Sequence, residues 1–228
     1  MIKVLYEDNH LLVVEKPAGM LVQADDTKDT DMLTELKAML KEKYHKPGNV
    51  YLGLVHRLDR PVGGVMVFAK TSKAASRLSE EVRTNNMHKT YYAVVMGKVE
   101  ESGSYNDKLL KDESTNISKV DPNGKESKLT YELVSYKDNM SLVKINLITG
   151  RSHQIRVQFS YHGHPLYGDQ KYNKDAIPNT DLALYASELR FIHPITKEEM
   201  TFKLDLPNKY PFNIFKWFIS LFLFLYWQ

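Results

Sequence analysis

Most apolar segments of this chain have the length of β-strands, and the turns between them are too short for parallel crossovers. Ile2–Tyr6 and Leu11–Val14 are separated by the turn-forming pair Asp8-Asn9. Lys128–Tyr136 and Leu142–Leu147 alternate apolar and polar residues, as half-buried strands do. A parallel pair needs a connection of about a dozen residues or more, so we expect neighbouring strands to run antiparallel. Further strands are predicted at Gly64–Ala69, Lys89–Val99, Leu182–Phe191 and Glu199–Leu204.

Two segments have instead the spacing of amphipathic helices. Thr30–Tyr44 carries its apolar residues on one stripe, and Asp29 or Thr30 can cap its first turn. Ser72–Arg83 has the same spacing and follows Thr71, another capping residue. The pattern therefore predicts an α+β fold in which a mixed, mostly antiparallel central sheet carries flanking helices.

The composition narrows the functional classes. The 228 residues, 43% of them apolar, suffice for the core of one catalytic domain. The net charge of +3 excludes a polybasic protein, and the absence of cysteine excludes disulfides, cysteine-ligated zinc and thiol nucleophiles. The lack of cysteine, and an acidic start where a signal peptide would be apolar, lead us to expect a cytoplasmic location.

The densest polar cluster is His56-Arg57-Leu58-Asp59-Arg60, in which one carboxylate lies between two arginines. Positive neighbours favour the ionised carboxylate, and an ionised carboxylate can act as a nucleophile or as an electrostatic stabiliser. The alternative is that Asp59 only forms a structural ion pair with Arg57 or Arg60. Residues 56–99 contain eight basic and three acidic residues, and this excess of five positive charges suits a polyanionic substrate.

A second cluster begins at Gly150, which permits a turn after the preceding strand. A short helix is predicted from Ser152 to about Tyr161. The helix start and the nearby Arg151 and Arg156 suit an anion such as a phosphate, or a partner carboxylate. A helix start with surface arginines is the alternative.

Two further groups of residues concern stacking and metal binding. In the strand that begins at Lys89, the adjacent Tyr91 and Tyr92 point to opposite faces, so one of them can stack on a base or take part in proton transfer. Downstream, His162 and His164 have no carboxylate or cysteine at a recognised ligand spacing, so we predict no metal site.

Four stretches of this chain occur in the order and spacing of a known family. They are Asp8–Met20, His56–Arg60 with Val67–Thr71, Lys89–Ala93 with Gly97, and Gly150–Arg156 with Gly163–Asp169. With these stretches the chain resembles the RluA-type family of RNA pseudouridine synthases, from about residue 2 to about residue 215. It departs from the family pattern at Pro61-Val62-Gly63, where hydroxyl-bearing residues are usual, and at Gln158, where a histidine is frequent.

The resemblance implies a division of the chain and a set of site residues. Residues 1–215 would form the pseudouridine synthase catalytic domain with a central cleft, and 216–228 an apolar tail of unknown role. Catalysis would fall to Asp59, Tyr91 and Arg156, of which Arg156 would pair with Asp59. The implied substrate-binding residues are His56, Arg57, Arg60, Lys89, Arg151, His153, Gln154 and Ile155.

The implied reaction isomerises a uridine that has left its stack in structured RNA, either tRNA or rRNA. The bond from the uracil nitrogen to the ribose breaks, the base turns, and carbon 5 bonds to the ribose instead. No group is lost and no electrons are exchanged, so we expect no cofactor and no metal. Asp59 would attack ribose carbon 1′, assist departure of the uracil, or attack the base. We expect a monomer without an accessory RNA-binding module, so that loops such as Tyr105–Lys128 select the RNA.

Three rival interpretations were weighed. An inactive RNA-binding protein of the same fold is opposed by the presence of Asp59, Tyr91 and Arg156 together. A hydrolase with a carboxylate pair lacks a second acid at a motif position. A membrane-surface protein is suggested only by the tail, whose apolar run is shorter than the roughly 20 residues of a spanning helix.

Overall fold

The computed structural model of the protein describes residues 2–215, and the predicted tail lies outside them. Within the described residues the chain forms two compact units. Unit 1 comprises the chain up to residue 88 together with residues 186–204. Unit 2 comprises residues 89–185 together with the chain from residue 205 onward.

The strands of unit 1 follow the order β1-β2-β4-β10, with β3 paired to β4 and β11 to β10. The pairings β1–β2, β2–β4, β3–β4 and β10–β11 are antiparallel. The bounds are β1 (Lys3–Glu7), β2 (Leu11–Lys16), β3 (Gly53–Leu54), β4 (Gly63–Ala69), β10 (Leu184–Ile192) and β11 (Glu199–Lys203).

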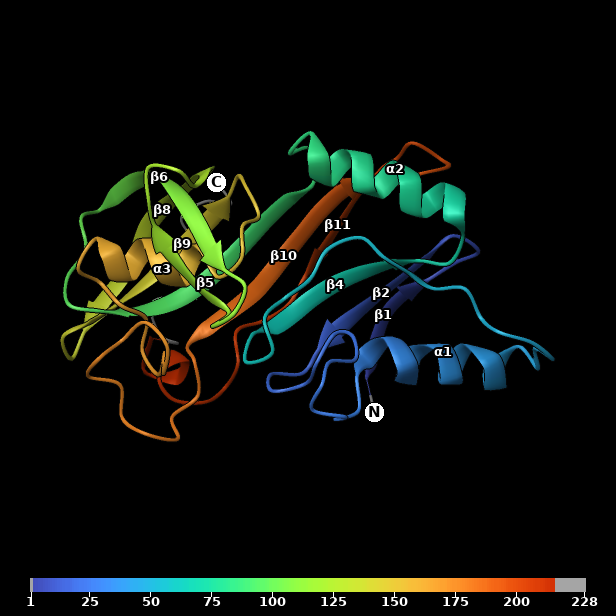
Figure 1. The fold of residues 1–228 in the computed structure, drawn as a ribbon, viewed down its shortest axis with the longest axis horizontal. Coiled ribbons are helices and arrows are strands. Elements are labelled where there is room, and N and C mark those ends of the chain that lie inside the picture. Colours follow the sequence, from blue (N-terminus) through green and yellow to red (C-terminus); the bar gives the residue numbers. More distant parts are fainter. Residues whose placement is uncertain (1, 216–228) are drawn as a thin grey trace, which may run out of the picture. The chain divides into compact units, whose positions relative to one another are not determined.

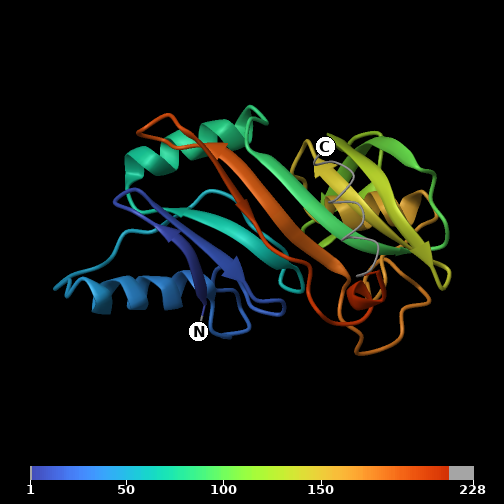
Figure 2. The same cartoon turned by 180° about the vertical axis from the view of Figure 1, so that it is seen from behind.

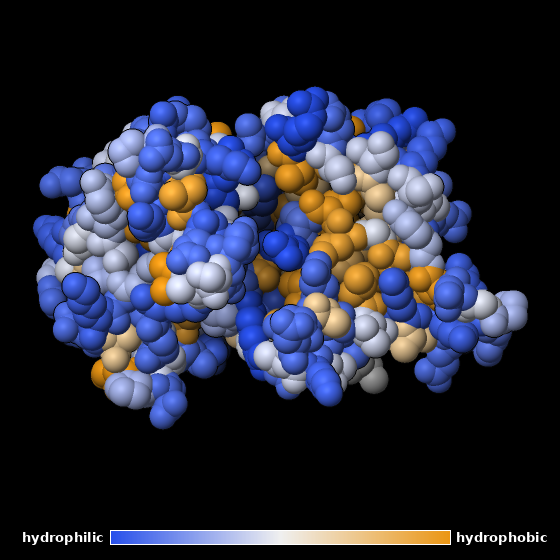
Figure 3. Space-filling model, in the orientation of Figure 1, coloured by the Kyte–Doolittle hydropathy of each residue, from blue (hydrophilic) through white to orange (hydrophobic). Residues whose placement is uncertain are grey.

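The helices of unit 1 lie along opposite margins of these strands. Figures 1 and 2 show α2 (Ser72–Arg83) along one margin and α1 (Met32–Lys43) along the other. Ala74 and Leu78 of α2 pack against a hydrophobic core, to which β2, β4 and β10 contribute every second residue. The strand residues of this core are Leu11, Val13, Val65, Val67, Ala69, Leu189 and Phe191. Apolar residues also gather over this part of the surface, between the two helices (Figure 3).

The strands of unit 2 follow the order β5-β9-β8-β6-β7, and each of these neighbouring pairs is antiparallel. Short turns join them, as the sequence pattern predicts. The bounds are β5 (His88–Met96), β6 (Ser102–Asp112), β7 (Ile117–Val120), β8 (Lys125–Lys137) and β9 (Met140–Leu147). A 3-10 helix, η1 (Phe212–Phe215), ends the described part of the chain.

Helix α3 (Gln154–Tyr161) packs against β6 and β8 through Phe159, which is fully buried. The Phe159 ring lies 5.1 Å from the ring of Tyr105 on β6 and 5.4 Å from that of Tyr131 on β8, measured between centroids. An aromatic cluster of this kind contributes both buried area and edge-to-face attraction. It therefore fixes α3, and with it the residues that α3 carries, against the sheet of unit 2.

The predicted α+β class and the mostly antiparallel sheet are confirmed, whereas three local predictions are wrong. Asp31 caps α1, not Asp29 or Thr30, because the helix begins at Met32 and the Asp31 side chain accepts from Thr34 N at 3.1 Å. The short helix begins at Gln154 rather than at Ser152.

The third correction concerns the segment Tyr105–Lys128, which was expected to form a loop. It contains most of β6, all of β7 and the start of β8, and β6 pairs antiparallel with both β7 and β8. Most of the expected loop is therefore part of the sheet of unit 2.

Within residues 2–215, no helix is long and apolar enough to cross a membrane.

Candidate active site

Asp59 lies in unit 1, in the loop between β3 and β4. The Asp59 carbonyl accepts a hydrogen bond from Val62 N at 3.0 Å, which closes a turn around the residue. The next carbonyl, that of Arg60, accepts from Gly19 N at 2.8 Å. The main chain of the Asp59 loop is therefore tied both to itself and to the segment that follows β2.

Lys16, the last residue of β2, binds the main chain of this loop through its side chain. Its side chain is 1% exposed, and its ammonium donates to the carbonyls of Pro17 (3.0 Å), Arg60 (2.9 Å) and Val62 (2.8 Å). Burial lowers the pKa of Lys16 to about 8, while the charge of Asp59 acts to raise it. The buried cation thus interacts favourably with the Asp59 carboxylate and holds the main chain on both sides of Pro61, two residues further along the loop.

Arg60 and His56 also have partners within unit 1. The Arg60 guanidinium donates to Gly19 O at 3.1 Å and to Asp29 Oδ2 at 2.6 Å, and both side chains of this ion pair are about half exposed. His56 accepts a hydrogen bond from Val67 N at its Nε2 atom, at 3.1 Å. Arg57 is exposed. The predicted binding residues of this cluster therefore share one loop, and two of them also connect it to its surroundings.

Gly64, at the start of β4, determines how closely β4 approaches β10. Its φ is +133°, and a Cβ atom there would lie 2.2 Å from the carbonyl oxygen of Ala186. A side chain at this position would therefore overlap the main chain of β10. The fold therefore demands a glycine at this position.

In unit 2, β5 carries Lys89 and Tyr91 on the same face because they are two residues apart in a strand. Tyr91 is 6% exposed and lies opposite Ile145 of β9. Burial lowers the pKa of Lys89, whose ammonium lies beside Gly150 at the start of the second cluster. The fold therefore brings the predicted residues of β5 next to those of the 150–156 segment.

The turn before α3 is held by the side chain of Gln154. Its Oε1 accepts from Thr149 Oγ1 at 2.8 Å and from Arg151 N at 3.0 Å, and its Nε2 donates to Lys128 O at 3.1 Å. Gln154 and Ile155 are 3% and 4% exposed. These contacts make Gln154 a support of the turn, in addition to the substrate-binding role that the sequence predicts.

Arg156, in the first turn of α3, is 5% exposed and forms an ion pair with the fully buried Asp169. Asp59, its predicted partner, belongs to unit 1, so the pairing of Arg156 with Asp59 stays a prediction. Lys16 and Asp169 lie within the motifs of the sequence, but no role is predicted for them there, and Tyr172 lies outside the motifs. Contacts between residues far apart in the sequence, such as that of Lys16 with Val62, connect them to the candidate residues.

Each cluster, taken by itself, offers groups that suit a charged or aromatic ligand. The cluster of unit 1 has a carboxylate in a loop tied by hydrogen bonds, and the cluster of unit 2 has a buried guanidinium, a tyrosine and a lysine with a lowered pKa. Within residues 2–215 there is no group of three or more His, Asp or Glu side chains placed to hold a metal ion.

The chain is similar in sequence to known proteins of one family. The profile of a family described as RNA pseudouridylate synthase matches residues 10–161. The ribosomal large subunit pseudouridine synthase C of Vibrio vulnificus is 36% identical over 205 residues, which cover 86% of this chain and 63% of that protein. The uncharacterized RNA pseudouridine synthase YhcT of Bacillus subtilis is 34% identical over 216 residues, which cover 90% of this chain and 70% of that protein.

The chain thus spans just under two thirds of the length of the Vibrio relative. Among solved structures, human RNA pseudouridylate synthase domain containing 4 has a TM-score of 0.76 at 23% identity, covering 90% of this chain and 88% of that chain. Human RNA pseudouridylate synthase domain containing 1 has a TM-score of 0.72 at 21% identity, covering 92% and 85%. These structures share the fold described above.

Proposed function

The chain belongs to the RNA pseudouridylate synthase family, and we propose that it converts specific uridines in RNA to pseudouridine. The observation that carries the proposal is the family match over residues 10–161, which includes Asp59, Tyr91 and Arg156. The RluA-type motifs quoted from the sequence fall in the same stretch or directly after it.

Asp59 is the proposed catalytic carboxylate. In its ionised form it attacks ribose carbon 1′, or the base, or assists departure of the uracil from the ribose. The freed uracil turns and bonds to the ribose through carbon 5, whose proton is then lost to solvent while nitrogen 1 gains one. The reaction therefore rearranges bonds within one nucleotide and uses no cofactor.

Arg156 and Tyr91 complete the proposed catalytic group. A guanidinium paired with Asp59 keeps that carboxylate ionised and directed, since an opposite charge favours the charged form. The buried Tyr91 ring offers a surface on which the uracil stacks, and its hydroxyl lies near the proton of carbon 5. The proposed separation of roles is that Asp59 reacts, Arg156 aligns it and Tyr91 holds the base.

The remaining predicted residues are assigned to RNA binding. Extracting the uridine from its stack costs a few kcal/mol, which contacts to the phosphates offset. The exposed Arg57, at the Asp59 loop, is suited to fill the space that the nucleotide leaves and to contact a neighbouring phosphate, and Lys89 and Arg151 are also suited to bind phosphate. His56, Arg60, His153, Gln154 and Ile155 line or support the same loops.

We propose large-subunit ribosomal RNA as the substrate. The basis is the similarity to the Vibrio relative, which is named as a ribosomal large subunit pseudouridine synthase. Transfer RNA, which the sequence allows equally, is the alternative. A monomer located in the cytoplasm stays a prediction.

The proposal is tested by tritium release from large-subunit ribosomal RNA transcripts labelled at carbon 5 of uracil. We expect release by the wild type and a loss of at least about 1,000-fold in Asp59→Asn, because the substitution removes the reacting carboxylate while preserving its shape. Asp26→Asn, a change of the same kind at an exposed position of unit 1, serves as the matched control.

Each result has a defined meaning. Equal release by the wild type and Asp59→Asn would remove Asp59 from the mechanism. Binding of the RNA without any release by the wild type, on ribosomal and transfer RNA alike, would show an inactive RNA-binding protein instead.

A further inference from the structure

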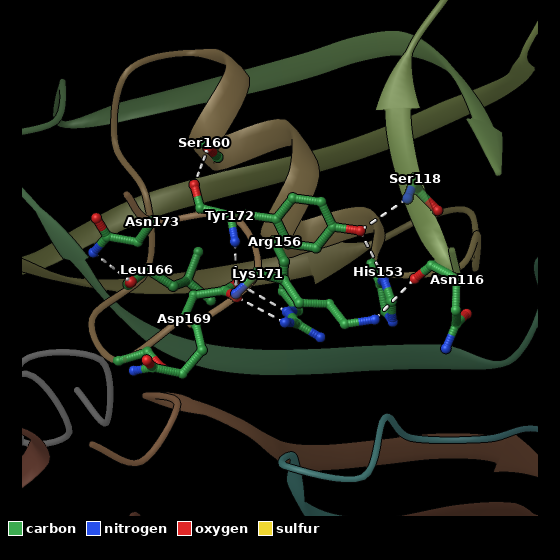
Figure 4. Close-up of polar contacts among 12 residues, drawn as sticks. Asn116, Ser118, His153, Arg156, Ser160, Leu166, Asp169, Lys171, Tyr172 and Asn173 are labelled. Carbon is green, nitrogen blue, oxygen red and sulfur yellow. Dashed lines mark hydrogen bonds and ion pairs between the residues drawn. The ribbon is translucent and has the colours of Figure 1, made fainter. Parts of the chain in front are cut away.

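Arg156 is clamped on one side by Asp169, in a geometry that only arginine provides. Arg156 Nε donates to Asp169 Oδ2 at 2.8 Å, and Arg156 Nη2 donates to Asp169 Oδ1 at 2.7 Å (Figure 4). Two parallel, charge-assisted hydrogen bonds fix the plane and the direction of a guanidinium, which a single contact does not. The side chains of the pair are 6% and 0% exposed, so solvent screening does not weaken them.

The main chain holds Asp169 in turn. Its Oδ1 atom accepts from Lys171 N at 3.0 Å and from Tyr172 N at 3.2 Å, while its carbonyl accepts from Asn173 N at 3.0 Å. The preceding residue, Gly168, has a φ of +72° and lies against the main chain of Asp181. The carboxylate is thus part of a tight turn and cannot follow Arg156 if the arginine moves.

Tyr172, on the same turn, covers the guanidinium with its ring. The carbon at the centre of the guanidinium, Arg156 Cζ, lies 5.1 Å from the ring centroid. The Tyr172 hydroxyl accepts from Ser118 N at 2.9 Å and contacts His153 Nδ1 at 2.7 Å (Figure 4). The ring is therefore held at its far end by the main chain of β7 and by the residue that precedes α3.

A second contact joins this turn to the β6–β7 hairpin. Lys171 Nζ donates to Asn116 O at 2.9 Å, beside the Ser118 contact. His153 has a φ of +53°, an uncommon conformation for a residue other than glycine. The turn at Asp169–Asn173, the hairpin and the start of α3 thus meet around the guanidinium of Arg156.

We propose that Asp169 and Tyr172 are positioning residues for Arg156. They hold the guanidinium in its reactive orientation before the RNA arrives, so that no binding energy is spent on ordering it. This inference rests on the proposed function, because it takes Arg156 to be the arginine that aligns the catalytic carboxylate. The new element is that the orientation of Arg156 depends on the Asp169 carboxylate and the Tyr172 ring, neither of which needs to contact the RNA.

The test separates the rate of the chemical step from RNA affinity. Single-turnover tritium release is measured with enzyme in excess over labelled ribosomal RNA, and the Kd for the same RNA by filter binding. In Asp169→Asn we expect a loss of about 100-fold in rate, typical of a misplaced catalytic group, and a change in Kd below about threefold. In Tyr172→Phe, which keeps the ring and loses both hydroxyl contacts, we expect a loss of about five- to tenfold.

Asp107→Asn is the matched control for the possibility that Asp169 only stabilises the fold. Asp107 is a nearly buried carboxylate of the same unit and also contacts α3, accepting from Gln158 Nε2 at 2.7 Å. The hydrogen bonds of its carboxylate go to Gln158 and His162 rather than to Arg156. We expect it to lower the melting temperature to an extent similar to Asp169→Asn and to keep the wild-type rate in the folded fraction.

A second measurement is independent of catalysis. The Nε–H proton of Arg156, buried against Asp169, should exchange slowly with water in ¹⁵N–¹H spectra and be identified by its absence in Arg156→Lys. Asp169→Asn should speed this exchange at least about tenfold, while Asp107→Asn should not, since an amide oxygen binds a guanidinium less strongly than a carboxylate.

The outcomes separate the two proposals. An inactive wild type with a protected Nε–H signal would contradict the proposed function while leaving the clamp on Arg156 demonstrated. An active wild type would overturn the positioning role if Asp169→Asn kept its rate, lost affinity in step with rate, or behaved like Asp107→Asn in both measurements.

Discussion

At the scale of single residues, Lys16 shows how a buried charge can stabilise an irregular loop, here the one that carries Asp59. Its three hydrogen bonds go to main-chain carbonyls. These contacts therefore depend on the backbone conformation of the loop and not on the side chains that the loop carries. Two of the carbonyls, those of Arg60 and Val62, flank Pro61, two residues after Asp59. Lys16 therefore stabilises a segment of the main chain that belongs to neither a helix nor a strand.

The lowered pKa of Lys16 predicts a pH dependence of stability. Burial lowers this pKa from 10.5 to about 8, so between these values the unfolded chain binds more protons than the folded one. The wild type should accordingly gain stability as the pH rises from 8 to 10.5. Relative to Lys16→Met the gain is about 3 kcal/mol in free energy of unfolding, measured by urea titration at several pH values.

Lys3→Met, at an exposed position of β1, controls for the loss of a surface lysine. The decisive quantity is the difference between wild type and variant at each pH. Parallel curves for the wild type and Lys16→Met would show that the ammonium is not desolvated in the folded protein.

The grouping of candidate residues in space was predictable from the sequence where these residues stand close together in the chain. Asp59 and Arg57 are identified by a short motif, and the fold places both in one loop. The clamp on Arg156 was not predictable, because Asp169 is 13 residues away and meets the arginine only through the tight turn after Gly168. The charge of Arg156 alone does not indicate which of the many carboxylates at such distances in the sequence will be its partner.

At the scale of elements, the N-terminus of α1 illustrates how a cap is chosen. Asp29, Thr30 and Asp31 all have suitable side chains, and the sequence does not distinguish them. Asp31 is 4% exposed, and its two carboxylate oxygens accept from Thr34 N (3.1 Å) and Thr34 Oγ1 (2.7 Å). Asp29 is instead half exposed and pairs with Arg60.

This arrangement predicts unequal effects of two neighbouring substitutions. Asp31→Ala should lower the free energy of unfolding by about 1–2 kcal/mol, because it removes the cap of α1 and both of its hydrogen bonds. Thr30→Ala, at an exposed position, should change it by less than about 0.5 kcal/mol. Chemical unfolding followed by circular dichroism measures both, and a larger effect at Thr30 would contradict the assignment.

The hairpin β6–β7 was missed for a physical reason. Along β6 the less exposed positions alternate as they should, but they include Gly103, Asp107 and Lys111 among the apolar residues. Asp107 faces inward because Gln158 and His162 supply hydrogen bonds to it. A pattern based on hydrophobicity therefore fails in a strand whose inner face is partly polar, whereas the regular apolar stripe of α2 is predicted to the residue.

At the scale of the whole molecule, charge is distributed unevenly along the chain. The net charge is +3, yet residues 56–99 alone have five more basic than acidic residues, so the rest is slightly acidic. Association with a polyanion should then depend on this stretch and weaken with salt.

For RNA binding we predict that the affinity falls steeply with salt and that Arg57→Gln makes it fall less steeply. Each lost phosphate contact lowers the slope of log K against log salt concentration by about 0.7–0.9. Lys41→Gln, the same loss of charge at an exposed position of α1, should leave the slope unchanged. Filter binding between low and moderate salt measures both slopes, and equal reductions would indicate a diffuse charge effect instead of a contact at Arg57.

The close approach of β4 to β10 has a consequence for how this protein can diverge. Because a Cβ atom at Gly64 would lie 2.2 Å from Ala186 O, that position is closed to every other amino acid. The three residues before it, Pro61-Val62-Gly63, already differ from the family's usual hydroxyl-bearing residues without any change at Gly64. The residues beside Asp59 can therefore change over generations, while Gly64 preserves the close approach of β4 to β10.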